Sequence, residues 1–183
     1  MDREQAWKLL CEFTKTDQLR RHGRSVEAVM RAAARKHGGD EETWGIVGLL
    51  HDFDYEQFPD KHPMAGKPIL EERGYPEEVI YAIQCHADFT GYERRSTMDK
   101  MIFAVDELTG FIIACTLVQP TKSLGQVKLS SVRKKLKDKA FARNVIREDI
   151  WKGIDELGVD FDEHVQFVID ALKPVATEIG LNP

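Results

Sequence analysis

A chain of 183 residues and 20.9 kDa is long enough for one compact domain with a full hydrophobic core, and short for two. Hydrophobic residues make up 42% of the chain and charged residues 31%, a balance that excludes a disordered or fibrous protein. The formal net charge of -5 disfavours general nucleic-acid binding, which usually needs a basic domain.

Two further features exclude a membrane or exported protein. The longest nearly apolar stretch, Met101 to Val118, contains Asp106 and Glu107, so it could not cross a bilayer cheaply. The first residues, MDREQAW, lack the pattern of an export signal. The three cysteines include no C-x-x-C pair, which argues against a disulfide framework or a zinc knuckle. Together these features predict a cytoplasmic protein.

Apolar residues recur at every third or fourth position along most of the chain, which predicts an all-α fold. Asp17 and Asp40 stand where helix N-caps belong, and Gly38 follows a predicted last turn. Phe53 to Lys61 and Gln119 to Lys128 carry the Pro and Gly content of loops. In chain order, the predicted helices span residues 2–13, 17–37, 41–52, 63–73, 77–87, 97–118, 129–138, 142–157 and 161–179.

Four of these helices place ionisable side chains on apolar faces or at buried ends. His22 falls on the apolar stripe of the second helix rather than on its charged face. The third helix is apolar almost all round and ends in His51 and Asp52. His86 shares the apolar face of the fifth helix, and Asp106 lies within one of the most apolar helices of the chain. All five side chains are therefore expected to point inward.

Each of these residues also has a simpler explanation when it is taken alone. A single histidine on an apolar stripe is more often a hydrogen-bonded core residue than a ligand, and Asp106 could cap a helix or pair with an arginine. The set as a whole favours a metal, because one divalent ion could satisfy several buried carboxylates and imidazoles together. Imidazole and carboxylate without thiolate suit Mn, Fe, Co, Ni or Zn, with Mg also open.

Other polar residues have two interpretations. His62 alone would be an exposed loop histidine, but it opens a helix that must pack beside His51 and Asp52. The basic run between Lys128 and Arg147 is either a solvated helix face or an anion-binding patch. We treat this run as a pointer toward phosphate.

The order of these residues resembles the HD superfamily of metal-dependent phosphohydrolases. The resemblance covers about residues 15–118 and rests on four motifs. These are LLHDFD around His51 and Asp52, H-P-M-A-G-x-x-I-L from His62, A-I-Q-C-H ending at His86, and FAVDELTG around Asp106. A lone HD dipeptide is a weak signal, whereas the ordered set in these helical contexts is specific.

The resemblance implies an HD-domain helical bundle, with residues 1–183 forming a single domain. Its metal-binding core would span about residues 15–118, and residues 119–183 would add C-terminal helices. His62 and His86 make the chain most similar to two-metal members such as the bacterial diadenosine tetraphosphate hydrolases. The chain reads ADFTGYE after His86 and lacks the GYP signature of the cyclic-dinucleotide phosphodiesterases. Cys85 stands where those enzymes usually carry the first of two paired histidines.

Carried over to this sequence, the resemblance implies a ligand set for two divalent transition-metal ions. The first ion would be held by His22, His51, Asp52 and Asp106. Asp52 would bridge to a second ion held by His62 and His86. The expected activity is hydrolysis of a phosphoester or phosphoanhydride, in a nucleotide or another small phosphorylated metabolite, by metal-activated hydroxide.

Roles beyond metal binding are expected for a few residues. Asp52, His51 and Asp54 are the candidate catalytic residues, and Asp54 and Asp88 are candidates for proton transfer or for supporting the ligands. Surface or capping duty is the alternative for both Asp54 and Asp88. Lys61, the nearby Lys67 and the basic run could bind substrate phosphates.

Two other function classes stay open at this stage. The same kind of ligand set supports di-iron oxygenases, which cleave C–C or C–P bonds with dioxygen. A non-catalytic module that senses nucleotides is the second alternative. Exposed aromatic residues on the C-terminal helices could also form the face of a homodimer.

Overall fold

The computed structural model describes residues 2–183 and confirms the all-α prediction. Within these residues no β-strand is present, and three short 3-10 segments, η1 (Asp88–Thr90), η2 (Leu124–Gln126) and η3 (Lys173–Ile179), accompany the α-helices. The α-helices are α1 (Arg3–Phe13), α2 (Asp17–His37), α3 (Glu41–Leu50), α4 (Gly66–Glu72), α5 (Glu77–Cys85), α6 (Thr97–Leu117), α7 (Leu129–Leu136), α8 (Arg147–Leu157) and α9 (Phe161–Leu172).

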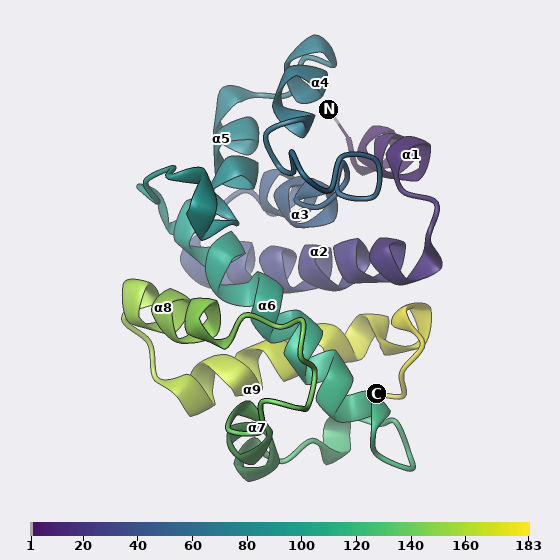
Figure 1. Cartoon of the computed structure of the whole chain (residues 1–183), viewed down its shortest axis with the longest axis vertical. Coiled ribbons are helices and arrows are strands. Elements are labelled where there is room, and N and C mark those ends of the chain that lie inside the picture. The colour runs from purple at the N-terminus through teal and green to yellow at the C-terminus, as the bar shows by residue number, and fades with distance from the viewer. Residues whose placement is uncertain (1) are drawn as a thin grey trace.

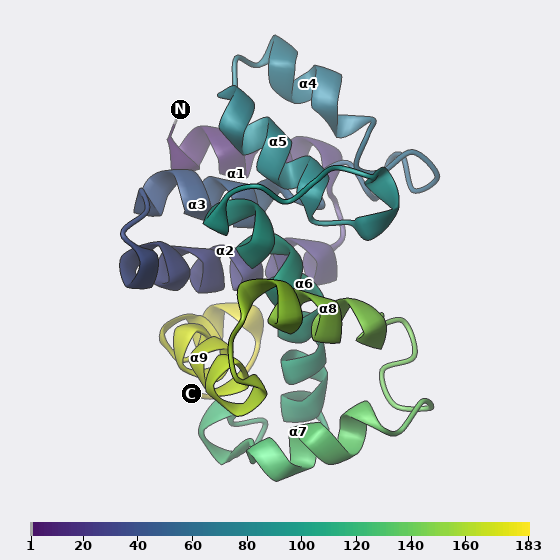
Figure 2. The same cartoon turned by 90° about the vertical axis from the view of Figure 1, so that its left-hand side faces the viewer.

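The helix α6 runs through both halves of the molecule (Figure 1). The first five helices form one group toward its N-terminal end, and α7, α8 and α9 form a second group, in which α8 reaches Ala104 in the N-terminal half of α6 (Figure 2). Both groups contact α6 directly, and α9 also packs on α2. The C-terminal helices therefore share one central element with the N-terminal half.

Local sequence explains where α6 and α3 begin and where α2 ends. Ser96 caps α6 by accepting a hydrogen bond from the backbone N–H of Asp99, whose carboxylate accepts one from the backbone N–H of Ser96 in return. At its C-terminus, α2 ends at Gly38, which adopts a left-handed conformation with φ 73°. Asp40 then caps α3 by accepting a hydrogen bond from the N–H of Thr43.

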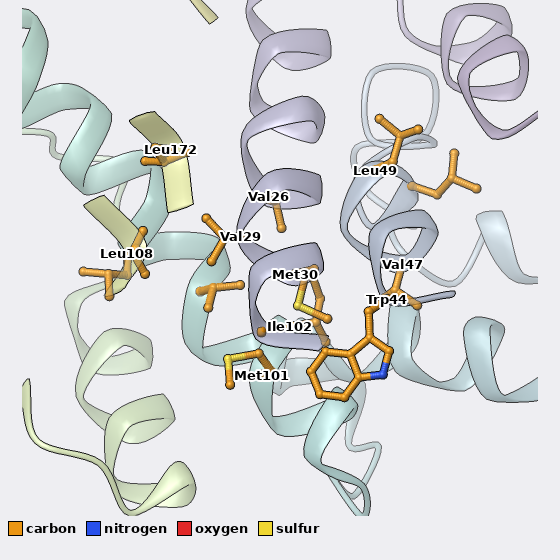
Figure 3. Close-up of a cluster of buried hydrophobic side chains, with 14 of the residues drawn as sticks. Val26, Val29, Met30, Trp44, Val47, Leu49, Met101, Ile102, Leu108 and Leu172 are labelled. Atoms are coloured by element: carbon orange, nitrogen blue, oxygen red, sulfur yellow. The ribbon is translucent and has the colours of Figure 1, made fainter. Parts of the chain in front are cut away.

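The apolar stripe of α2 forms the centre of the core. Figure 3 shows Val26, Val29 and Met30 of this helix between side chains of α3 and α6. Val47 and Ile102 are among those partners, and neither is accessible to solvent. Buried apolar residues form one cluster that extends from Ala6 to Leu181, so the C-terminal helices contribute to the same core.

Glycines allow α2 and α3 to approach closely beside the predicted metal ligands. A Cβ on Gly23 would lie 2.9 Å from the carbonyl oxygen of Leu49, and a Cβ on Gly48 would lie 2.8 Å from that of Val26. Gly153 of α8 plays a similar part against α6, because a Cβ there would lie 2.6 Å from the Cα of Ala104. Any larger residue would force these helices apart.

Several predicted helix boundaries were wrong around the histidines. The helix predicted over 41–52 ends at Leu50, and His51 and Asp52 begin a series of turns. The helix predicted over 63–73 begins only at Gly66, and the one over 77–87 ends at Cys85, so His86 lies just beyond it. The histidines predicted as metal ligands thus stand at or beyond helix ends more often than within helices.

Two C-terminal helices are also shorter than predicted. The helix expected from residue 142 begins at Arg147, because Ala142 has a positive φ of 44° and cannot continue a right-handed helix. Instead, the Arg147 guanidinium donates hydrogen bonds to backbone carbonyls of the preceding segment, including those of Leu136 and Val145. The helix predicted over 161–179 changes to 3-10 form at Lys173, next to Pro174.

Among residues 2–183, none of the helices combines the length and the apolar character needed to span a bilayer.

Candidate metal centre

The six residues predicted as metal ligands lie together, although they come from five separate parts of the chain. His22 is on α2 and Asp106 on α6. His51 and Asp52 follow α3, where the change from helix to turn lets adjacent side chains face one site. The remaining two are His62, in the turns before α4, and His86, at the end of α5. Their donor atoms form two groups that share Asp52.

The first group is built around one carboxylate oxygen of Asp106. Its Oδ1 lies 2.9 Å from Nε2 of His22 and 3.2 Å from Nε2 of His51. The two imidazole nitrogens are 3.1 Å apart. Oδ2 of Asp52 completes the group, 3.4 Å from Nε2 of His51 and 3.6 Å from Nε2 of His22.

The second group uses the other carboxylate oxygen of Asp52. Its Oδ1 lies 3.0 Å from Nε2 of His62 and 3.5 Å from Nε2 of His86. These two nitrogens are themselves 3.0 Å apart. A single carboxylate therefore faces two sets of histidines, one with each oxygen.

Backbone carbonyls fix the orientation of two of the rings. Nδ1 of His51 donates to the carbonyl of Gly48 over 2.8 Å, and Nδ1 of His86 donates to that of Ile83 over 2.6 Å. Because a carbonyl can only accept, each Nδ1 carries the proton and a neutral ring presents a bare lone pair at Nε2. Lone pairs and carboxylate oxygens that converge in this way fit a cation, so the donor set suits divalent metals.

The electrostatics of the centre agree with this assignment. Burial disfavours the charged form of His51, but the negative charges of Asp52 and Asp106 outweigh it and raise the pKa of His51 well above its ordinary value. For His62, burial is likewise outweighed by Asp52 and Asp54, and the pKa rises to about 9. The negative potential that would hold protons here would equally attract a metal cation.

The structure places Asp54 behind the centre rather than in it. This side chain is completely buried, and its Oδ1 accepts a hydrogen bond from Nδ1 of His62 over 2.7 Å. Its other oxygen has no hydrogen-bond partner within the described residues. Asp54 is thus in a position to orient His62, and it does not line the neighbouring cavity.

A cavity of about 580 Å³ opens onto the two groups. Apart from the candidate ligands, it is lined by Tyr55, Ala87, Asp88, Phe89, Glu107, Gly110, Ile146 and Asp149. Burial, with a further contribution from the charge of Asp106, raises the pKa of Glu107 to about 7. Apart from the candidate ligands, most of the polar side chains on this wall are carboxyl groups.

The cations that were expected to bind phosphate lie elsewhere. No lysine or arginine in the described part of the chain lines the cavity. Lys61 is exposed, and the Nζ of Lys67 donates to the hydroxyl of Tyr92 over 3.2 Å. Within the basic run, Arg133 pairs with Asp162. These cations therefore lie outside the cavity wall.

Sequence reasoning missed several residues of the cavity wall. Glu107 had a visible signal, because it is the second acid in the otherwise apolar helix that carries Asp106. Phe89, Ile146 and Asp149 had none, since they approach the metal centre only through the tertiary packing of η1 and α8.

A comparison with protein-family models matches residues 19–110 to the HD domain, just over half of the chain. The protein therefore belongs to the HD domain family, whose members bind divalent metal ions and are mostly metal-dependent hydrolases. Among curated proteins and among solved structures, no match was found. The matched segment contains all six candidate metal ligands.

Proposed function

We propose that this protein is a metal-dependent phosphohydrolase with a two-metal centre. The observation that carries the proposal is the carboxylate of Asp52, whose two oxygens face separate sets of histidines. Two divalent cations held there would supply a water that is acidic enough to attack phosphorus near neutral pH and would offset charge on the phosphoryl oxygens.

In this proposal the protein's own residues have three tasks. His22, His51 and Asp106 would hold one ion, and His62 with His86 would hold the other, both together with Asp52. The buried Asp54 would keep the His62 ring in place. This arrangement is similar to that of the two-metal members of the family, so a small phosphorylated metabolite, with nucleotides included, is the proposed substrate.

We also propose that residues 119–183 complete the same domain. The supporting observation is the single cluster of buried apolar residues, to which Val165, Val168 and Leu172 of α9 belong.

The test begins with elemental analysis of the purified full-length protein, followed by a screen of phosphorylated metabolites with added Mn, Co, Fe, Mg or Zn. We expect release of phosphate with at least one metal, and the same rate when oxygen is excluded. Asp52→Asn should abolish turnover. The matched control is Asp60→Asn, which changes an exposed carboxylate in the same turns and should leave turnover intact.

The alternatives predict different results. Turnover that requires dioxygen would favour an oxygenase, and nucleotide binding without turnover at any metal would favour a sensor. Either result would contradict the proposed hydrolase.

A further inference from the structure

The wall of the metal-site cavity has a composition that is unusual for a phosphate-binding pocket. Beyond the candidate metal ligands it presents three carboxyl groups, those of Asp88, Glu107 and Asp149. No lysine or arginine among residues 2–183 lines it. A second phosphate on the substrate would therefore meet like charge rather than a cationic partner.

The charges of this wall are only partly compensated. Oδ1 of Asp88 lies 2.9 Å from the guanidinium of Arg94 and 2.6 Å from Nζ of Lys152. By contrast, Glu107 and Asp149 form no salt bridge with any residue that the structure describes. At the floor of the cavity, the positive charge of two divalent ions would be balanced by the negative charges of Asp52, Asp106 and a phosphate dianion. The carboxyl groups of Asp149 and Glu107 are then left without a cationic partner in the described part of the chain.

Apolar side chains border the same cavity. Phe89 is 75% exposed, Tyr55 45% and Ile146 48%, although these are large hydrophobic residues that proteins usually bury. The Tyr55 ring also lies close to the floor, with its centroid 5.4 Å from that of His62. Aromatic faces beside carboxylates form a surface that suits an organic cation.

We propose that the substrate is a phosphomonoester whose organic half carries a positive charge, such as an alkylammonium group. This inference rests on the proposed hydrolase function and names its substrate class. The phosphate would sit at the metal ligands, and the ammonium group would face Asp149 and Glu107 beside the aromatic rings. Water adds to phosphorus, the P–O ester bond breaks, and the leaving oxygen takes a proton, which gives inorganic phosphate and an amino alcohol.

The experiment compares two substrates of the same shape on the metal-loaded full-length protein. Choline phosphate carries a quaternary ammonium group, and 3,3-dimethylbutyl phosphate replaces its nitrogen with carbon. We expect kcat/KM to be about tenfold higher for choline phosphate, with a smaller ratio at high salt. Asp149→Asn should lower this ratio by about fivefold, since one partly exposed ion pair is removed. Asp155→Asn, an exposed carboxylate on the same helix, should leave the ratio unchanged.

A second measurement separates this inference from the hydrolase proposal. Saturation-transfer NMR can detect free choline on the wild type, and Asp149→Asn should weaken the signal without any need for turnover. If choline binds through Asp149 but no phosphoester is cleaved, the hydrolase proposal fails and the cation subsite stands. Equal kcat/KM for both substrates, a preference for nucleoside polyphosphates, or no choline binding would overturn the inference.

Discussion

Asp54 and His62 form a buried hydrogen bond of 2.7 Å that holds one imidazole against the shared carboxylate of Asp52. Asp54 is inaccessible to solvent, so it can act on the centre only through His62. A carboxylate that receives the second N–H of a ligating histidine fixes the ring and makes it a better ligand.

The first prediction follows from this contact. Asp54→Ala should weaken binding of the second ion by about 10- to 100-fold, the usual effect of removing such a partner. Asp54→Asn keeps an acceptor oxygen without the charge and should have a smaller effect. Isothermal titration calorimetry with the metal measures the affinity of both variants for the second ion. If Asp54→Ala binds the second ion as tightly as the wild type, Asp54 does not orient His62.

A second prediction concerns the number of ions. His22→Ala should deplete the first ion and His86→Ala the second, because each histidine belongs to only one of the two groups. Elemental analysis of each variant after dialysis should show about one ion fewer per chain than the wild type. Loss of both ions in either variant would show that the two groups do not bind independently.

A third prediction tests the close approach of α2 and α3. Gly48→Ala should destabilise the protein by about 1–3 kcal/mol, because the new methyl group would overlap the backbone at Val26. Gly110→Ala is the matched control within a helix, since a Cβ there meets nothing within 4 Å. That change should be neutral, or stabilising by up to ~1 kcal/mol. Urea denaturation of both variants provides the comparison, and equal stability would contradict the packing argument.

The fourth prediction is a pH dependence that arises far from the metal ligands in sequence. Burial lowers the pKa of His164 from 6.5 to about 4, and its Nε2 has no hydrogen-bond partner within the described residues. Below pH 6.5 the unfolded chain binds a proton that the folded chain excludes. The free energy of unfolding should therefore fall as the pH drops from about 6.5 to about 4, by on the order of 3 kcal/mol.

Two variants isolate this contribution. His164→Leu should remove it, so the stability difference between variant and wild type should change across pH 4 to 6.5. His37→Gln removes a nearby charge that contributes to lowering the pKa of His164, so it should shift the pH profile only slightly. Denaturation at a series of pH values gives the profiles. Parallel profiles for His164→Leu and the wild type would show that His164 titrates normally.

The sequence predicted the helices well where periodicity and end signals agree. For α2, an apolar stripe is followed by Gly38, and its predicted bounds of 17–37 match the structure. Prediction failed where tertiary contacts decide the backbone, as in the segment before α8. There Ala142 is left-handed and Arg147 binds several carbonyls, and neither feature has a pattern along the chain.

The candidate site likewise contains residues that the sequence predicts and residues that only the tertiary structure reveals. Helical spacing predicted that His22, His86 and Asp106 point inward, and the structure brings all six predicted ligands together, although their metal binding stays a prediction. Glu107 was visible in the sequence as an acid in an apolar helix. Asp149 could not be found, because its approach to the cavity depends on how α8 packs against α6.

The close approach of Gly153 to Ala104 has a consequence for the candidate metal ligand Asp106, two residues further along α6. Asp106 projects from a helix whose position is set partly by α8, so a bulky residue at Gly153 would tilt that carboxylate away from the histidines without touching any of them. The last third of the polypeptide thus helps to position a candidate metal ligand, although it contributes none of the six candidate ligands itself. Truncating it would expose Phe111, which is buried against Phe141, to water and would favour aggregation.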